Sequence, residues 1–174
     1  MNEGERLATL ISVIQMLTEA LSWTGRMHIQ KLVYFAQNLL HLPTEYEFVL
    51  YQRGPYSFEL DADIRLVRAT GAVDISPAPP YGPSYFTTPL GEEMGERSPI
   101  TKELSDQLKG LAQRLGPKTA ADLELLATAH YAVSEGYQSE EGIVKRVVSL
   151  KPQFSPVQVS QALEEVRELQ AQFG

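Results

Sequence analysis

The three histidines are the residues that would most readily make this chain a metalloprotein or an enzyme. They lie far apart, at His28, His41 and His130, and none belongs to an HExxH motif or another paired-ligand spacing. His130 shares a helical face with Leu123 and Leu126, which indicates a hydrogen-bonded histidine in the core. The sequence therefore predicts no metal site and no cofactor.

Three carboxylates, Glu59, Asp61 and Asp63, form the second group with possible chemistry, because paired acids can act as general acid and base. Nothing in their spacing sets them opposite one another, and we expect them to be exposed on a helix. The chain also contains no GxSxG, P-loop or GxGxxG motif. These observations predict that the protein is not an enzyme.

A ridge of polar residues suggests binding chemistry instead. Lys31, Tyr34 and Gln37 follow an i, i+3, i+6 line on a predicted helix whose apolar residues occupy the other side. The ridge has three possible roles: a contact surface, a polar clasp that holds the following turn, or a solvated face with a half-covered tyrosine.

The second binding segment is the turn Arg53-Gly54-Pro55-Tyr56-Ser57. Proline fixes φ, glycine permits a close approach, and Ser57 is a good N-cap for the next helix. Arg53 and Tyr56 have no such structural duty, and both residue types are enriched in interface hot spots. We therefore predict a partner-binding site made by the two segments together, comprising Lys31, Tyr34, Gln37, Arg53, Gly54, Pro55, Tyr56 and Ser57.

The elements that would position this site follow from periodicity and capping signals. We expect helices over residues 4–21 and 24–41, a short strand over 46–50, a helix over 58–70 ended by Gly71, and a hairpin of strands 72–76 and 84–88, followed by a helix opened by Thr88-Pro89. This order resembles a winged helix, with the proline-rich loop 77–83 as the wing. The predicted fold class is α+β and mostly helical.

The rest of the chain, residues 97–174, is predicted to be a helical extension, although one continuous domain over 1–174 is the alternative. Its helices are expected from Ser98-Pro99 to about Gly116, from Thr119 to about Glu135, over 139–150 and from Ser155-Pro156 onward. The last helix carries an a/d seam, whose default role is packing on its own domain and whose alternative role is a homodimer contact through 156–173.

Composition narrows the class of protein further. The net charge of −7 disfavours general affinity for nucleic acid, which depends on Lys and Arg. The helix over 58–70 would be the recognition helix of a winged helix, but carboxylates in its first turns would repel phosphates. No apolar run reaches the roughly 18–20 residues that span a membrane, and the chain has no cysteine and no basic signal-peptide start. A cytoplasmic protein is expected.

Three segments carry a resemblance to a known family. The KLVYFAQ segment at 31–37, the LYQRGPYSFEL segment at 50–60 and the stretch 123–131 resemble the YwgA-like branch of the Panacea-domain superfamily, over about residues 20–170. Members of that superfamily are known as antitoxins that neutralise small toxins, and some as adaptors that present a bound protein to a protease. The resemblance brings no catalytic residues.

These expectations combine into one function and one alternative. The leading hypothesis is a non-enzymatic, antitoxin-like or adaptor-like module that masks a toxin or effector protein. The alternative is a winged-helix DNA-binding transcriptional regulator.

Overall fold

Eight helices and two short hairpins make up residues 1–20, 23–77, 80 and 82–174, the part of the chain that the computed structural model describes. The elements are α1 (Glu3–Ala20), α2 (Arg26–Leu39), β1 (Val49–Tyr51), β2 (Gly54–Tyr56), α3 (Phe58–Ala69), β3 (Val73–Ser76), β4 (Ser84–Thr87), α4 (Pro89–Gly95), α5 (Lys102–Leu115), α6 (Ala120–Ser134), α7 (Glu140–Leu150) and α8 (Pro156–Phe173). The predicted fold class, α+β and mostly helical, is confirmed.

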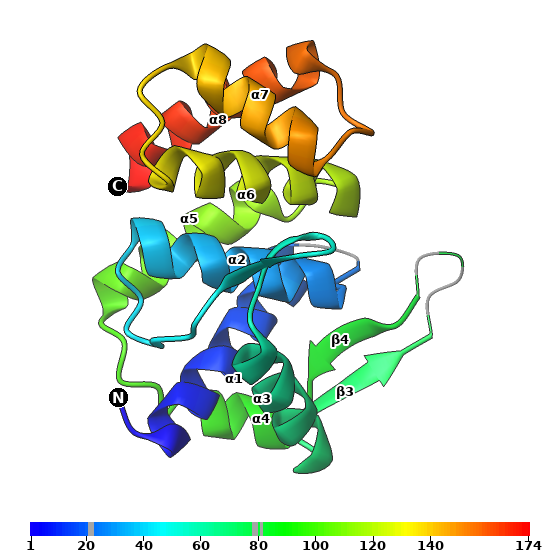
Figure 1. Cartoon of the computed structure of the whole chain (residues 1–174). Helices are drawn as coiled ribbons and strands as arrows, with labels where there is room; N and C mark the ends of the chain where they lie inside the picture. The colour runs from blue at the N-terminus through cyan, green and yellow to red at the C-terminus, as the bar shows by residue number, and fades with distance from the viewer. Residues whose placement is uncertain (21–22, 78–79, 81) are drawn as a thin grey trace.

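Helix α2 lies in the middle of the molecule (Figure 1). Helices α6, α7 and α8 gather on one side of it, while α1, α3, α4 and the β3–β4 hairpin lie on the other. Buried apolar side chains from both predicted parts, 1–96 and 97–174, form one continuous cluster. A boundary near residue 97 stays a prediction, and the packing shows that the later helices cover the N-terminal elements.

The segment between α2 and α3 forms a hairpin that the sequence pattern did not indicate. Strands β1 and β2 pair antiparallel, and only Gln52 and Arg53 lie between the paired residues Tyr51 and Gly54. The prediction of a single strand over 46–50 that runs into a turn is therefore wrong. Gly54 has a φ of +80°, which permits the tight reversal, and its neighbour Pro55 belongs to β2. This hairpin is a two-stranded sheet of its own and does not pair with β3–β4.

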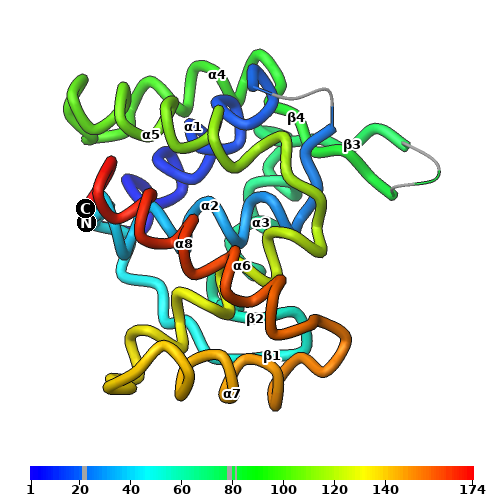
Figure 2. Tube along the Cα trace, turned by 90° about the horizontal axis from the view of Figure 1, so that it is seen from above, coloured from blue at the N-terminus to red at the C-terminus, as the bar shows by residue number. Residues whose placement is uncertain are grey.

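The predicted hairpin is present as β3 and β4, which project away from the helices (Figures 1 and 2). The expected wing loop connects them, but its residues 78–79 and 81 lie outside the described part of the chain. Tyr85 of β4 is 5% exposed and packs into the core, so this aromatic residue belongs to the interior and not to the tip of a wing.

Local capping signals account for most helix starts. Ser57, Thr88, Thr119 and Ser155 each accept a hydrogen bond from a backbone N–H of the first turn, as expected. The prediction that a helix begins at Ser98-Pro99 is wrong. Helix α5 begins at Lys102, because the Thr101 side chain accepts from the backbone N–H of Leu104.

The seam of the last helix faces the interior of the chain. The seam residues Val159, Ala162, Val166 and Leu169 are buried in the common core, which is the expected default role. A homodimer through 156–173 stays a prediction, and it would have to use the exposed side of α8. Among the described residues, no helix combines the length and apolar character needed to cross a membrane.

Candidate protein-binding site

Lys31, the first residue of the predicted polar ridge, lies inside the protein. Its side chain is fully buried, and its Nζ donates a 2.6 Å hydrogen bond to the carbonyl oxygen of Pro55. Burial lowers the pKa of the Lys31 ammonium to about 7, although the nearby Glu124 carboxylate acts in the opposite direction. The geometry fits the clasp and not the contact surface, because Lys31 holds the β1–β2 hairpin against α2.

Tyr34, the second residue of the ridge, is also buried, with 3% of its surface exposed. Its hydroxyl makes a 2.8 Å hydrogen bond with Nδ1 of His130 on α6. Burial raises the pKa of Tyr34 and lowers the pKa of His130 to about 4. The expectation that His130 is a hydrogen-bonded core histidine is confirmed, and a solvated face is wrong for Lys31 and Tyr34.

The buried His130 should make the protein less stable in mild acid. Between the pKa of about 4 in the folded state and the ordinary value of 6.5, only the unfolded chain takes up the proton. Stability is therefore lost as the pH falls through this window, by roughly 3 kcal/mol in total. Urea unfolding at pH 7 and pH 4.5 measures the loss. His130→Gln, which keeps an acceptor for Tyr34 but does not titrate, should show a shallower decline, and an equal decline would contradict this role.

Gln37, the third residue of the ridge, holds the loop that leads to β1. Its Nε2 donates to the carbonyl oxygen of Tyr46 over 2.8 Å, and its Oε1 accepts from the backbone N–H of Tyr46 over 2.9 Å. The Thr44 hydroxyl donates to the same Oε1. Lys31 and Gln37 thus fix the backbone at Pro55 and Tyr46 from below, whereas Tyr34 links α2 to α6 through His130.

Gln30 makes an equivalent contact that the sequence analysis missed. This fully buried side chain donates to the carbonyl oxygen of Ser57 over 2.9 Å and accepts from the Ser57 N–H over 3.0 Å. Ser57 itself is buried as the N-cap of α3. The sequence feature that could have identified Gln30 was its position beside Lys31 and one turn before Tyr34, in a helix with few charged residues.

Gly54 is where the hairpin comes closest to α6. A Cβ at this position would lie 2.7 Å from the Thr128 hydroxyl and 3.3 Å from the Glu124 carbonyl oxygen. Glycine is therefore required both by the positive φ and by the close approach of the turn to the helix. Sequence reasoning predicted a close approach at Gly54 but gave no indication that α6 is the neighbour.

A buried ion pair from the C-terminal half fixes the tip of the hairpin. Lys151, at the end of α7, lies 2.6 Å from the Glu124 carboxylate of α6 and also donates to the carbonyl oxygen of Gln52. Both side chains of the pair are no more than 10% exposed. Residues 97–174 thus hold the β1–β2 turn in place, which the sequence did not indicate.

Above this buried base lies an exposed group of aromatic side chains, the aromatic patch, made of Tyr51, Tyr56 and Phe58. Their ring centroids are 5.1–5.7 Å apart, and Tyr51 and Phe58 are 47% and 58% exposed. Arg53 at the hairpin tip is exposed and has no ion-pair partner among the described residues. Of the predicted binding residues, only Arg53 and Tyr56 therefore reach the surface with side chains suited to contact.

Two of the three acids in α3 are placed differently from the prediction. Asp63 is 5% exposed and accepts from Arg6 and from the Tyr46 hydroxyl, each over 2.8 Å. Asp61 is 2% exposed and pairs with Arg26 at 3.0 Å and with Arg65. The expectation of exposed helix acids is wrong for both, because arginines from other elements neutralise them in the interior.

Comparisons with known proteins do not assign this site. No protein-family model matches the chain, and no curated protein matches it. Within the described ranges, no group of three or more histidine, aspartate or glutamate side chains is placed to hold a metal ion.

Proposed function

We propose that the protein is a non-enzymatic protein-binding module that uses the aromatic patch together with Arg53. The observation that carries the proposal is the pair of exposed rings, Tyr51 and Phe58, which pack on each other. The turn that follows Tyr51 carries Arg53, which is exposed and has no acidic partner in the described residues. Aromatic residues and arginine dominate the binding energy of protein interfaces. The surface fits a protein that offers an apolar area to the rings and a carboxylate to Arg53.

The rigid base beneath the patch supports the same proposal. Gln30 and Lys31 of α2 and Lys151 at the end of α7 fix the backbone at Ser57, Pro55 and Gln52 from two different helices. A surface that is already ordered loses little conformational entropy when a partner binds. The buried part of the predicted site would thus contribute to affinity without touching the partner.

The resemblance of the 31–37 and 50–60 segments to Panacea domains supports an antitoxin-like or adaptor-like role. In that role the protein masks a toxin or effector by covering its active surface, and it needs no catalytic group of its own. The matching residues of these segments are mostly those that build the base, while Arg53 and Tyr56 lie at its outer edge.

The proposal is tested with a protein partner captured from the native host and then purified. The variant Arg53→Glu/Phe58→Ala changes two exposed side chains, whereas Tyr56 is half-buried and less suitable. We expect at least 10-fold weaker binding, because each hot-spot side chain contributes about 2 kcal/mol. The melting temperature should stay within a few degrees of the parent.

A matched control is Lys102→Glu/Val157→Ala, which changes the charge by the same amount and removes another exposed apolar side chain, 66% exposed at Val157. This control should bind like the parent protein. If both double variants bind the partner with the parent's affinity, the aromatic patch is not the binding surface.

One observation favours the alternative, a DNA-binding winged helix. The buried and paired state of Asp61 and Asp63 removes much of the negative charge expected at the start of α3, and Arg65 and Arg68 lie on its exposed side. The net charge of −7 still opposes binding to phosphates. A mobility shift with duplex DNA that weakens steeply with salt, and that is lost in Arg65→Glu, would favour the regulator.

A further inference from the structure

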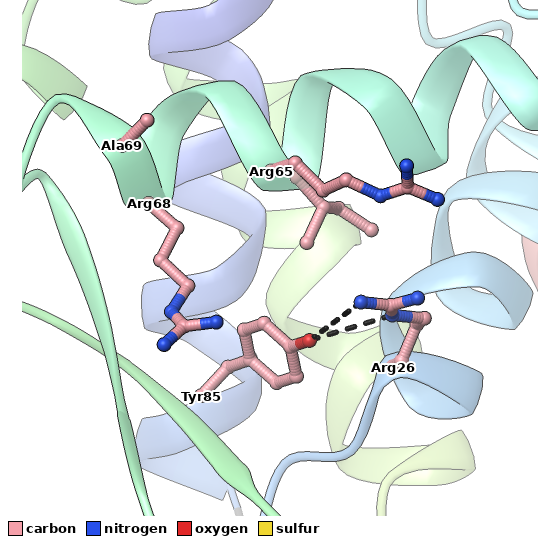
Figure 3. Close-up of a pocket in the computed structure, with 6 residues that line it drawn as sticks. Arg26, Arg65, Arg68, Ala69 and Tyr85 are labelled. Atoms are coloured by element: carbon pink, nitrogen blue, oxygen red, sulfur yellow. Dashed lines mark hydrogen bonds between the residues drawn. The ribbon is translucent and has the colours of Figure 1, made fainter.

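A cavity lined by three arginines lies between the start of α2, helix α3 and strand β4 (Figure 3). It has a volume of about 300 Å³ and is lined by Arg26, Ile64, Arg65, Arg68, Ala69 and Tyr85. We call it the arginine pocket. It shares no residue with the aromatic patch, and the proposed protein contact does not explain it.

The charges around the arginine pocket do not balance. Arg26 and Arg65 share a single buried carboxylate, that of Asp61. Arg68 has no acidic partner in the part of the chain that the structure describes. Three guanidinium groups against one carboxylate leave a local charge of about +2 on a chain whose net charge is −7. An anion in the pocket would compensate this excess.

The pocket also contains a buried hydroxyl that can donate. Tyr85 is 5% exposed, and its hydroxyl oxygen accepts from Arg26 Nε and Nη2 over 3.4 and 3.2 Å. Because the Tyr85 oxygen accepts in both contacts, its O–H can donate to a ligand in the pocket. Figure 3 shows the Tyr85 hydroxyl directed toward Arg26, with Arg68 on the other side of the ring.

A second cavity adjoins the first and offers room for an apolar group. It has a volume of about 320 Å³, shares Arg26 and Tyr85 with the arginine pocket, and is otherwise lined by Trp23, Gly25, Met27, Arg53, Pro83 and Ala120. Its walls are mainly apolar or aromatic, whereas the charged groups concentrate in the arginine pocket. The two cavities together suit a molecule with an anionic end and an aromatic or apolar end.

We propose that the arginine pocket binds the phosphoryl group of a small organic phosphate. A phosphate monoester carries −1.5 to −2 charges at neutral pH, which matches the local excess better than the single charge of a carboxylate. Its three terminal oxygens can accept from guanidinium groups that approach from different elements. The concave shape favours a compact ligand over the backbone of a duplex.

Calorimetric titration of the purified protein with phenyl phosphate tests the proposal, with benzoate at equal ionic strength as the carboxylate analogue. The emission of Trp23, the only tryptophan in the chain, reports on the adjoining cavity. We expect saturable binding of phenyl phosphate and at least 10-fold weaker binding of benzoate. Equal affinities, or no binding of phenyl phosphate, would overturn the assignment to a phosphoryl group.

The residue to change is Arg68, because its removal leaves no buried acid without a partner. Arg68→Glu should weaken phenyl phosphate binding at least 10-fold, whereas Lys102→Glu, with the same change of charge, should leave it unaltered. Arg68→Gln serves as a second variant if Arg68→Glu does not fold, and it should weaken binding in the same direction. Equal effects of Arg68→Glu and Lys102→Glu would show a general charge effect and would overturn the site.

A short duplex DNA is the last ligand to be titrated. DNA binding that depends on Arg68 but is not displaced by phenyl phosphate would assign the arginines to a nucleic-acid surface and overturn the small-molecule site. Arg53 lines the second cavity, so the variant that separates the two proposals is Phe58→Ala, which changes the aromatic patch and no lining residue of either cavity. Failure of either proposal can therefore be recognised without the other.

Discussion

Replacing Glu124 by leucine is expected to lower the free energy of unfolding by about 3–5 kcal/mol. Its carboxylate lies 2.6 Å from the ammonium of Lys151, and neither side chain is more than 10% exposed. Without Glu124, the Lys151 ammonium keeps the carbonyl oxygen of Gln52 as an acceptor but faces the like charge of Lys31 with no carboxylate between them. A buried ammonium without a counterion is far more costly than the ion pair, because the desolvation penalty is no longer offset.

A double-mutant cycle separates the lost pair from the lost packing. Glu124→Leu/Lys151→Met removes both charges, and we expect it to recover at least half of the stability lost in Glu124→Leu. Glu141→Leu is the surface control, because it breaks the exposed pair with Lys145 and should cost about 1 kcal/mol or less. Urea unfolding of these three variants, of the single variant Lys151→Met and of the parent measures each value. A double variant no more stable than Glu124→Leu would contradict the account of the uncompensated charge.

The helix boundaries were predictable because they depend on residues close in sequence. Ser57, Thr119 and Ser155 each act within one helical turn, so their effect is visible without knowledge of the fold. The predicted start of α5 was wrong for a local reason, because Thr101 caps the helix although Ser98-Pro99, three residues earlier, is also a helix-start signal. Strand β2 was missed because a three-residue strand containing glycine and proline has no strand pattern of its own.

The candidate site was only partly predictable, because burial depends on elements distant in sequence. A helical wheel of α2 separates an apolar side from a polar one, but it cannot show that α6 and the β1–β2 hairpin cover the polar side. For the same reason Asp61 and Asp63 appeared exposed, although Arg26 and Arg6 pair with them. The sequence identified the residues that organise the turn, and the structure separates those that support it from those that reach solvent.

Gln30 is a second supporting residue whose loss should destabilise the protein. Gln30→Leu is expected to lower the free energy of unfolding by about 2–4 kcal/mol, because it leaves the buried Ser57 N–H without an acceptor and removes one bond to the Ser57 carbonyl. That carbonyl keeps its helical bond from the Asp61 N–H, so the N–H accounts for most of the loss. Chemical denaturation at pH 7 measures it, and a loss below about 0.5 kcal/mol would contradict the account.

Gln30→Glu tests the same contact without a change of size. At neutral pH the carboxylate still accepts from the Ser57 N–H, but it faces the Ser57 carbonyl oxygen, to which Gln30 donates in the parent protein. Its folded-state pKa should therefore be raised, so the deficit relative to the parent shrinks as the pH falls and the acid regains a proton to donate. Comparing variant and parent at each pH cancels the acid sensitivity of His130. Because Ser57 caps α3, Gln30→Glu should also loosen Phe58 and weaken partner binding. Arg53→Glu/Phe58→Ala, in contrast, is expected to weaken binding with a change of only a few degrees in melting temperature.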